Sequence, residues 1–258
     1  MNQPSWMEDP VLKRLISEAT VDPQTIGLIL GGSRGAGRAD EASDYDLYWV
    51  LTDEAYDQQQ QSGESQHIKQ SADGQPLLDI VYTCLRELVQ AASHPGWWTP
   101  GYASAHLLLD KNGEIAPVLQ SFATMPEDKA IADAAGFFDD YLNSFYRSLK
   151  AWRRQDELGA RLHAVDSIMY LVRTLFSLER RWPPYHDRLR VQLALLEDQG
   201  WPPGMLPETF LGIVRTGDPK LQQKLEARVE ALMRDRGYGN VLDSWGNDIE
   251  QIKALHFD

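Results

Sequence analysis

The chain has 258 residues, of which 25 are Lys or Arg and 38 are Asp or Glu, so its formal net charge at pH 7 is −13. A surface with this charge repels nucleic acid and anionic lipid, which argues against a protein that reads DNA or RNA. Hydrophobic residues make up 43% of the chain, which predicts a folded protein with one large domain or two modest ones.

The chain contains one cysteine, Cys84, which cannot form a disulfide within the chain. Its first residues have neither a basic start nor a long apolar run, so no signal peptide is visible. No apolar run approaches the roughly 20 residues that a membrane-spanning helix needs. We therefore expect a cytoplasmic protein without a membrane partner.

The first half of the chain predicts an α/β domain. Asp9 and Pro10 suit the N-cap and first position of a helix that ends before Asp22. Short apolar runs predict strands at residues 25–30, 46–52, 77–83 and 106–109. The polar residues 53–75 are typical of an exposed excursion or a hairpin, and residues 84–92 of a helix. Residues 1–125 are therefore interpreted as a mixed sheet with flanking helices.

From about residue 126 the hydrophobic pattern changes to a helical period. Expected helices lie at residues 137–152, 162–176, 189–197, 221–233 and around 249–255. The connections between them are short. Residues 126–258 are therefore predicted to form a second domain, an all-α helical bundle.

The most informative segment begins where the first strand ends, at Gly31-Gly32-Ser33-Arg34. Glycines allow the backbone to approach a phosphate chain, and the Ser33 hydroxyl can donate to phosphate oxygens. Arg34 could form a bidentate pair with the same groups. The segment lacks the Gly-Lys-Ser/Thr ending of a P-loop, which argues against a Walker-type ATPase.

Three carboxylates follow this segment. Asp44 and Asp46 are two residues apart on an extended segment, so their side chains share a face. Asp79 lies within the apolar run Leu77–Val81, where an unpaired carboxylate is costly. Hard oxygen ligands suit Mg²⁺, and three carboxylates could bind two such ions.

At these residues the sequence resembles the nucleotidyltransferase superfamily related to DNA polymerase β. Within it, the chain resembles the bacterial aminoglycoside and lincosamide nucleotidyltransferase-like proteins. The family pattern is Gly-Ser, then Asp-x-Asp, then a carboxylate on a later strand. It is matched by Gly32-Ser33, Asp44, Asp46 and Asp79.

The resemblance implies transfer of an NMP, AMP in the first instance, from ATP or another NTP with release of pyrophosphate. It further implies that Asp44 and Asp46 hold two Mg²⁺ ions and that Asp79 holds chiefly the catalytic one. A small molecule with a hydroxyl group, such as a polycationic aminoglycoside, is the expected acceptor. The oligomeric state is not readable, although an exposed strand edge or helix face would allow a homodimer.

Other functions stay open. The chain could be a protein AMP-transferase of the toxin–antitoxin type, or a non-catalytic nucleotide-binding regulatory module. An RNA-modifying nucleotidyltransferase is disfavoured by the net charge of −13. No residue stands out as the general base, and the candidates are Asp139, Asp140, Asp166, Glu179, His163 and His186.

Overall fold

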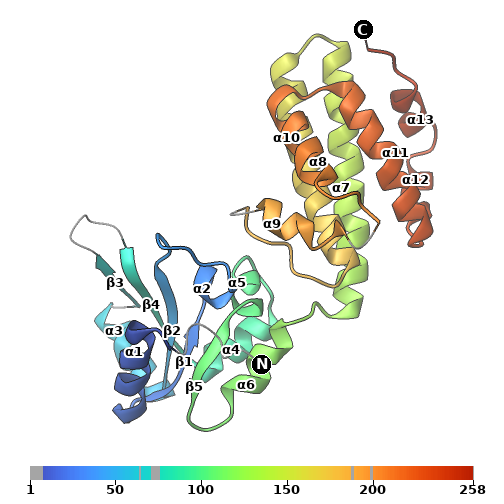
Figure 1. Ribbon diagram of the computed structural model, residues 1–258. Helices are drawn as coiled ribbons and strands as arrows, with labels where there is room; N and C mark the ends of the chain where they lie inside the picture. The colour runs from blue at the N-terminus through green and yellow to red at the C-terminus, as the bar shows by residue number, and fades with distance from the viewer. Residues whose placement is uncertain (1–7, 64, 71–75, 187–188, 198–199, 258) are drawn as a thin grey trace. The chain divides into compact units, whose positions relative to one another are not determined.

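The chain divides into two compact units, Met1–Thr124 and Met125–Asp258 (Figure 1). The computed structural model describes residues 8–63, 65–70, 76–186, 189–197 and 200–257. The first unit is built around a sheet and the second is helical, so the expected fold class is confirmed.

A five-stranded mixed sheet forms the centre of the first unit, with the strand order β3-β4-β2-β1-β5. Only β2 and β4 pair in parallel, whereas the other neighbours are antiparallel. The strands are β1 Thr25–Leu30, β2 Tyr45–Leu51, β3 Gln66–Gln70, β4 Pro76–Cys84 and β5 His106–Asp110.

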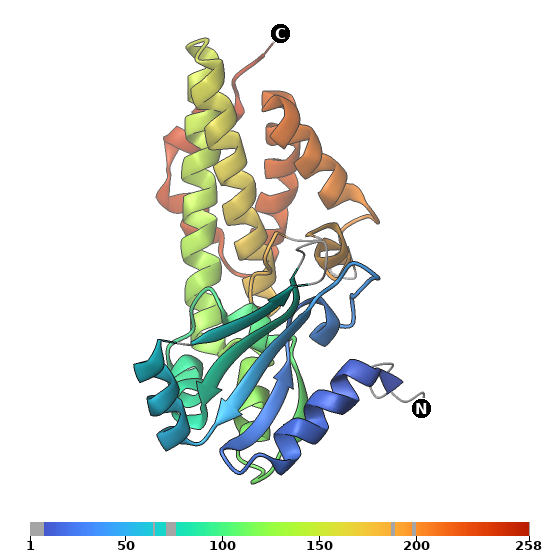
Figure 2. The same cartoon turned by 90° about the vertical axis from the view of Figure 1, so that its left-hand side faces the viewer.

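Helices cover both faces of this sheet (Figure 2). Leu28 and Leu30 of β1 pack in the core beneath α1, whereas Ile29 faces the opposite core, to which α4, α5 and α6 contribute. This alternation follows from the two-residue period of a strand. The helices of the unit are α1 Pro10–Val21, α2 Gly32–Gly35, α3 Asp53–Ser62, α4 Leu85–Ser93, α5 Thr99–Ala103 and α6 Ile115–Phe122.

The polar segment after β2 contains more regular structure than expected. Residues 53–62 form α3, because Thr52 caps the helix by accepting from the Ala55 N–H and because Gly63 ends it at a φ of 80°. The following strand, β3, pairs with β4 as an antiparallel hairpin although all its residues are exposed. The expectation of a hairpin is therefore correct for the second part of the segment and wrong for the first. Residues 64 and 71–75 lie outside the described part of the chain.

The second unit is a set of helices around one hydrophobic core. Its two longest helices, α7 and α8, form a hairpin that contributes Phe138, Phe145 and Leu171 to this core. The expected bundle is confirmed. The helices are α7 Glu127–Arg153, α8 Glu157–Leu178, α9 Leu189–Ala194, α10 Met205–Thr216, α11 Pro219–Asp235, α12 Gly239–Ser244 and α13 Asn247–Lys253.

Helix α10 does not appear in the sequence-based prediction. The Gly- and Pro-rich segment at 200–204 precedes it, and Pro207 lies in its first turn. A proline in the first turn removes an N–H that has no partner within the helix, so the helix tolerates it. None of the helices in the described part of the chain is long and apolar enough to cross a membrane.

Helix α11 carries a buried carboxylate, Glu226. The Glu226 side chain is 1% exposed, and its Oε1 has no hydrogen-bond partner in the described structure. The Oε1 of Gln222, one turn earlier, lacks a partner as well. Burial raises the pKa of Glu226 to about 7, although the nearby Lys253 ammonium opposes the shift. At neutral pH this carboxyl is therefore poised between its protonated and ionised forms.

Replacing Glu226 with Gln should stabilise the protein at alkaline pH. Because the folded-state pKa lies above the ordinary value, the protein loses stability as the pH rises from about 4.5 through 7. Glu226→Gln removes this loss, so its free energy of unfolding should exceed that of the wild type by about 1–3 kcal/mol at pH 8.5. Urea unfolding at pH 5 and pH 8.5 measures the difference.

Glu230, one turn further along α11, provides the control. Its partial burial favours a higher pKa, but hydrogen bonds from Lys253 and Arg234 outweigh burial and lower the pKa. Glu230→Gln should therefore destabilise the protein at pH 8.5. A stabilising effect of both substitutions would instead reflect the relief of net negative charge and would contradict the role of burial.

Candidate active site

The parallel pairing of β2 and β4 brings two of the predicted carboxylates together. In this register Asp46 lies directly beside Asp79. Their strand neighbours Leu47 and Ile80 pack in the core beneath α1. Since side chains alternate along a strand, Asp46 and Asp79 lie together on the opposite face of the sheet.

Asp44 completes the cluster. It immediately precedes β2, two residues before Asp46, and all three aspartates are half-buried. The pKa of Asp46 is raised to about 6, first by burial and then by the negative charges of Asp44 and Asp79. The three carboxylates are therefore close enough for the ionised forms to repel one another.

A glycine turn packs directly against this cluster. The Gly31 N–H donates to the backbone carbonyl of Asp46 at 2.8 Å, which extends the pairing of β1 and β2 into the turn. Gly32 has a φ of 55°, and a Cβ at this position would lie 1.7 Å from the Asp46 Oδ2. Only glycine fits here, because both the backbone conformation and the available space exclude a side chain.

Arg34 holds the segment that carries Asp44. Its Nε donates to the Asp44 carbonyl at 3.0 Å and its Nη2 to the Ser43 carbonyl at 2.7 Å. Its guanidinium also stacks over the Tyr45 ring at 4.0 Å, and the Tyr45 hydroxyl donates to Asp9 at 2.8 Å. This guanidinium therefore positions the Asp44 segment, and its predicted contact with phosphate stays a prediction.

Ser33 lies in the short helix α2, between Gly32 and Arg34. Its hydroxyl makes no hydrogen bond to any described residue. It is thus available as a donor to a ligand beside the glycine turn.

The chemistry of the donor set fits a divalent cation. Three carboxylates are hard oxygen ligands, and Mg²⁺ typically completes its octahedral shell with water and substrate phosphates. Within the described ranges, however, no three acidic, His or Cys side chains already lie in a metal-binding arrangement. Binding of Mg²⁺ by Asp44, Asp46 and Asp79 therefore stays a prediction, and it requires the side chains to converge further.

Sequence reasoning missed one polar neighbour of the cluster. Gln66 of β3 donates its Nε2 to the Asp79 Oδ1 at 2.6 Å. The sequence gives no strand pattern at β3, because this strand is short, exposed and polar. Its pairing with β4 depends on the hairpin. Gln66 fixes the orientation of the Asp79 carboxyl without adding charge.

The candidates for the general base all lie in the helical unit. Asp139 accepts a hydrogen bond from the Trp245 indole at 2.8 Å, and Glu179 pairs with Arg236 at 2.9 Å. Asp166 lies 4.0 Å from the His163 ring. Asp139 and Glu179 thus serve packing and pairing inside this unit, which argues against their use as bases.

Comparisons with known proteins add limited information. A family model described as a domain of unknown function (DUF4037) matches residues 102–188, a range that contains none of the three aspartates. No curated protein matches the chain. Among solved structures, the chain is similar to a nucleotidyltransferase-like protein from Exiguobacterium sibiricum 255-15. The sequence identity is 13% and the TM-score 0.45, with 93% of this chain and 76% of that chain covered. The interpretation of the site therefore rests on its own residues.

Replacing Gly32 with Ala should cost more stability than the strain of its left-handed backbone conformation alone. Gly37 has a similar φ of 66° but no atom within 4 Å of an added Cβ, so Gly37→Ala should cost about 1–2 kcal/mol of stability from backbone strain. Gly32→Ala adds the clash with Asp46 and should cost a further ~1–3 kcal/mol. Chemical denaturation of both variants measures the difference, and equal losses would contradict the close packing of the turn on Asp46.

Removal of one charge from the cluster should stabilise the protein in the absence of metal. The raised pKa of Asp46 means that the folded protein loses stability as the pH rises from about 4 through 6. With EDTA present at pH 7.5, Asp46→Asn should therefore raise the free energy of unfolding by about 1–3 kcal/mol. The two proteins should have the same stability at pH 4.

Asp110→Asn is the control for this prediction. The Asp110 carboxylate accepts hydrogen bonds from the Gly113, Ile115 and Ala116 N–H groups, so its substitution should destabilise the protein. If Asp46→Asn also destabilises the metal-free protein at pH 7.5, the repulsion among the three aspartates is not the dominant effect at Asp46.

Proposed function

We propose that this chain is a nucleotidyltransferase that moves an NMP, AMP in the first instance, from an NTP to a hydroxyl group. The observation that carries the proposal is the alignment of Asp46 with Asp79 on parallel strands, with Asp44 beside them and the Gly31-Gly32 turn packed on Asp46. Like charges are normally kept apart inside proteins. Three half-buried carboxylates next to a glycine turn destabilise the folded protein through their repulsion, so we infer that they bind a ligand.

Asp44, Asp46 and Asp79 would hold Mg²⁺, which neutralises their charge and that of the triphosphate during an in-line displacement at the α-phosphorus. In this proposal, the binding of Mg²⁺ depends on pH. Because the pKa of Asp46 is raised to about 6, this carboxyl is fully ionised only above that pH or with a cation present.

The glycine turn supplies the remaining contacts of the nucleotide in this proposal. The Ser33 hydroxyl has no partner in the described structure and would donate to a phosphate oxygen. Gly32 allows the phosphates to approach the backbone next to Asp46. Arg34 keeps Asp44 in position through the two backbone carbonyls that it binds.

The proposed acceptor is a small molecule with a hydroxyl group. The net charge of −13 favours a cationic acceptor and disfavours RNA, and aminoglycosides combine hydroxyl groups with positive charge. A polypeptide acceptor or a regulatory nucleotide-binding role would use the same carboxylates. These alternatives differ in whether pyrophosphate is released and in what the NMP becomes attached to.

Release of pyrophosphate tests the proposal directly. The wild-type protein should release pyrophosphate from one NTP when Mg²⁺ and an acceptor from a panel of aminoglycosides and lincosamides are both present. Asp44→Ala with Asp46→Ala should reduce the rate by at least about 1,000-fold, because the metal-dependent stabilisation of the transferred phosphoryl group is lost. Mass spectrometry of the acceptor should find the added mass of the NMP.

Glu54→Ala with Asp128→Ala removes the same charge at two exposed positions outside the cluster and should leave the rate unchanged. Without a productive acceptor, calorimetry with ATP and Mg²⁺ separates the remaining outcomes. Tight binding without turnover, lost on Asp44→Ala with Asp46→Ala, would favour the regulatory module over the transferase. Absence of binding would overturn the assignment of the carboxylates to metal and nucleotide.

A further inference from the structure

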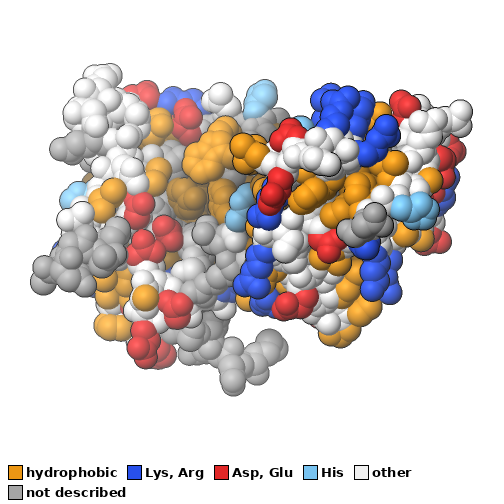
Figure 3. All heavy atoms as spheres, turned by 90° about the horizontal axis from the view of Figure 1, so that it is seen from above, with side chains coloured by type: hydrophobic (Ala, Val, Ile, Leu, Met, Phe, Trp, Pro, Cys, Tyr) orange, Lys and Arg blue, Asp and Glu red, His pale blue; other side chains and the backbone are white. Residues whose placement is uncertain are grey.

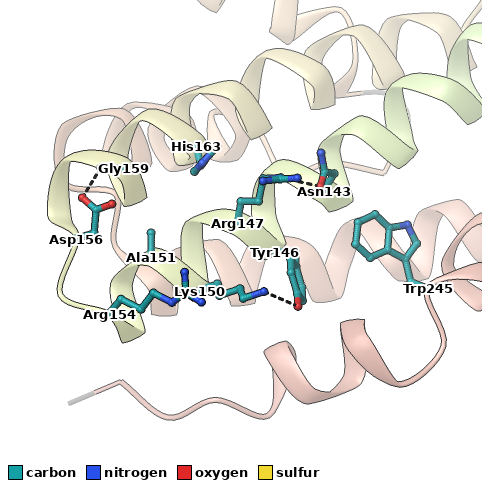
Figure 4. A pocket seen from close by; sticks show the side chains of 10 residues that line it. All are labelled: Asn143, Tyr146, Arg147, Lys150, Ala151, Arg154, Asp156, Gly159, His163 and Trp245. Atoms are coloured by element: carbon teal, nitrogen blue, oxygen red, sulfur yellow. Dashed lines mark hydrogen bonds between the residues drawn. The ribbon is translucent and has the colours of Figure 1, made fainter.

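A second candidate site lies in the helical unit. Its residues follow the three aspartates by more than half the first unit's length in sequence, and its charge is positive where theirs is negative. On the face seen in Figure 3, Lys and Arg side chains gather in clusters despite the net charge of −13. In the helical unit, Arg147, Lys150 and Arg154 line a pocket of about 300 Å³ near the connection between α7 and α8 (Figure 4). This volume is at the lower end of the range for pockets that bind small molecules.

The positive charges of the pocket come from one face of α7 and from its C-cap residue, Arg154. Arg147, Lys150 and Arg154 follow one another at intervals of three and four residues, so they lie on the same side of the helix end. The C-terminus of a helix favours cations, which accounts in part for their presence. It does not account for the pocket that they line together with His163 and Trp245.

Two of these side chains, Arg147 and Lys150, donate hydrogen bonds to neutral partners. The Arg147 Nε donates to the Asn143 Oδ1 at 3.0 Å, and the Lys150 Nζ donates to the Tyr146 hydroxyl at 3.3 Å. Among the described residues, no carboxylate lies within ion-pairing distance of Arg147, Lys150 or Arg154. By contrast, Arg161, only seven residues after Arg154, pairs with Glu157 at 2.6 Å.

Asp156 contributes a carboxylate to the lining of the pocket. It is the N-cap of α8, where it accepts from the Gly159 N–H at 3.0 Å. A capping carboxylate is held by the first turn of its helix and is less available to neutralise neighbouring cations. The pocket therefore keeps an excess of positive charge.

An aromatic wall adds a preference for shape. The rings of Tyr146 and Trp245 lie 5.9 Å apart at an angle of 49°, and both are half-buried. The Lys150 ammonium lies 5.0 Å from the Tyr146 ring centre. A ligand could place a planar or apolar part against these rings and its negative charge against the guanidinium groups.

We propose that this pocket binds a small phosphate-bearing molecule. The phosphate would lie between Arg147, Lys150 and Arg154, since guanidinium groups can bind phosphate oxygens in a bidentate manner. The proposal does not rest on the carboxylate cluster or on nucleotidyl transfer. It gives the helical unit a binding function of its own.

Calorimetry in EDTA, with inorganic pyrophosphate and AMP as probes, tests this proposal. At least one probe should bind the wild-type protein, and binding should persist in Asp44→Ala with Asp46→Ala. The triple variant Arg147→Gln, Lys150→Gln and Arg154→Gln should weaken binding by at least about tenfold, because several charge-assisted hydrogen bonds are lost. Adenosine, which lacks phosphate, should bind more weakly than AMP.

The matched control replaces three exposed cations outside the pocket, Arg153, Lys224 and Arg228, with Gln. It changes the net charge by the same amount and should retain wild-type binding. An equal loss in both triple variants would assign the effect to overall charge and overturn the proposal, as would failure of both probes to bind the folded wild-type protein. Binding of an RNA oligonucleotide without binding of either probe would replace the proposal with a nucleic-acid contact.

Discussion

The parallel pairing of β2 with β4 is the constraint on which the candidate active site depends. Because Leu47 and Ile80 must face the core beneath α1, the register that buries them also places Asp46 beside Asp79 on the other face. A slip of one residue would bury the carboxylates and expose the leucine and isoleucine. Hydrophobic packing on one face of the sheet thus maintains charge repulsion on the other, and the raised pKa of Asp46 is the electrostatic consequence.

The elements around the cluster restrain it without neutralising it. Gln66 binds Asp79 through a neutral amide, and Arg34 donates to the backbone carbonyls of Ser43 and Asp44. If the aspartates contributed to stability, we would expect an arginine or lysine between them to offset their mutual repulsion. In the proposed function, Mg²⁺ would balance the negative charge of the three aspartates.

Much of this site follows from the sequence because its signals are local. The alternation in β2 and β4 predicts which side chains share a face, and the glycines after β1 predict the turn. The contribution of Gln66 is not predictable, because β3 has no hydrophobic pattern and owes its place to the hairpin with β4. The positioning role of Arg34 is equally hidden, since it depends on the stacking of its guanidinium on Tyr45, eleven positions later. Local pattern predicts elements, whereas the partners of polar side chains depend on tertiary contacts.

The pocket on α7 is a group of positive charges in an acidic chain. A strongly acidic chain can gain solubility from dispersed carboxylates, but neither solubility nor the helix C-terminus explains why three cations line one pocket. Elsewhere in the helical unit, Arg161, Arg234 and Arg236 each pair with a carboxylate. Other cations in the described part of the unit, such as Arg153, Lys224 and Arg228, also make no ion pair, so the three pocket cations are distinguished by the cavity that they line together. A phosphate group would supply the missing negative charge, just as a cation would supply the positive charge that the aspartate cluster lacks.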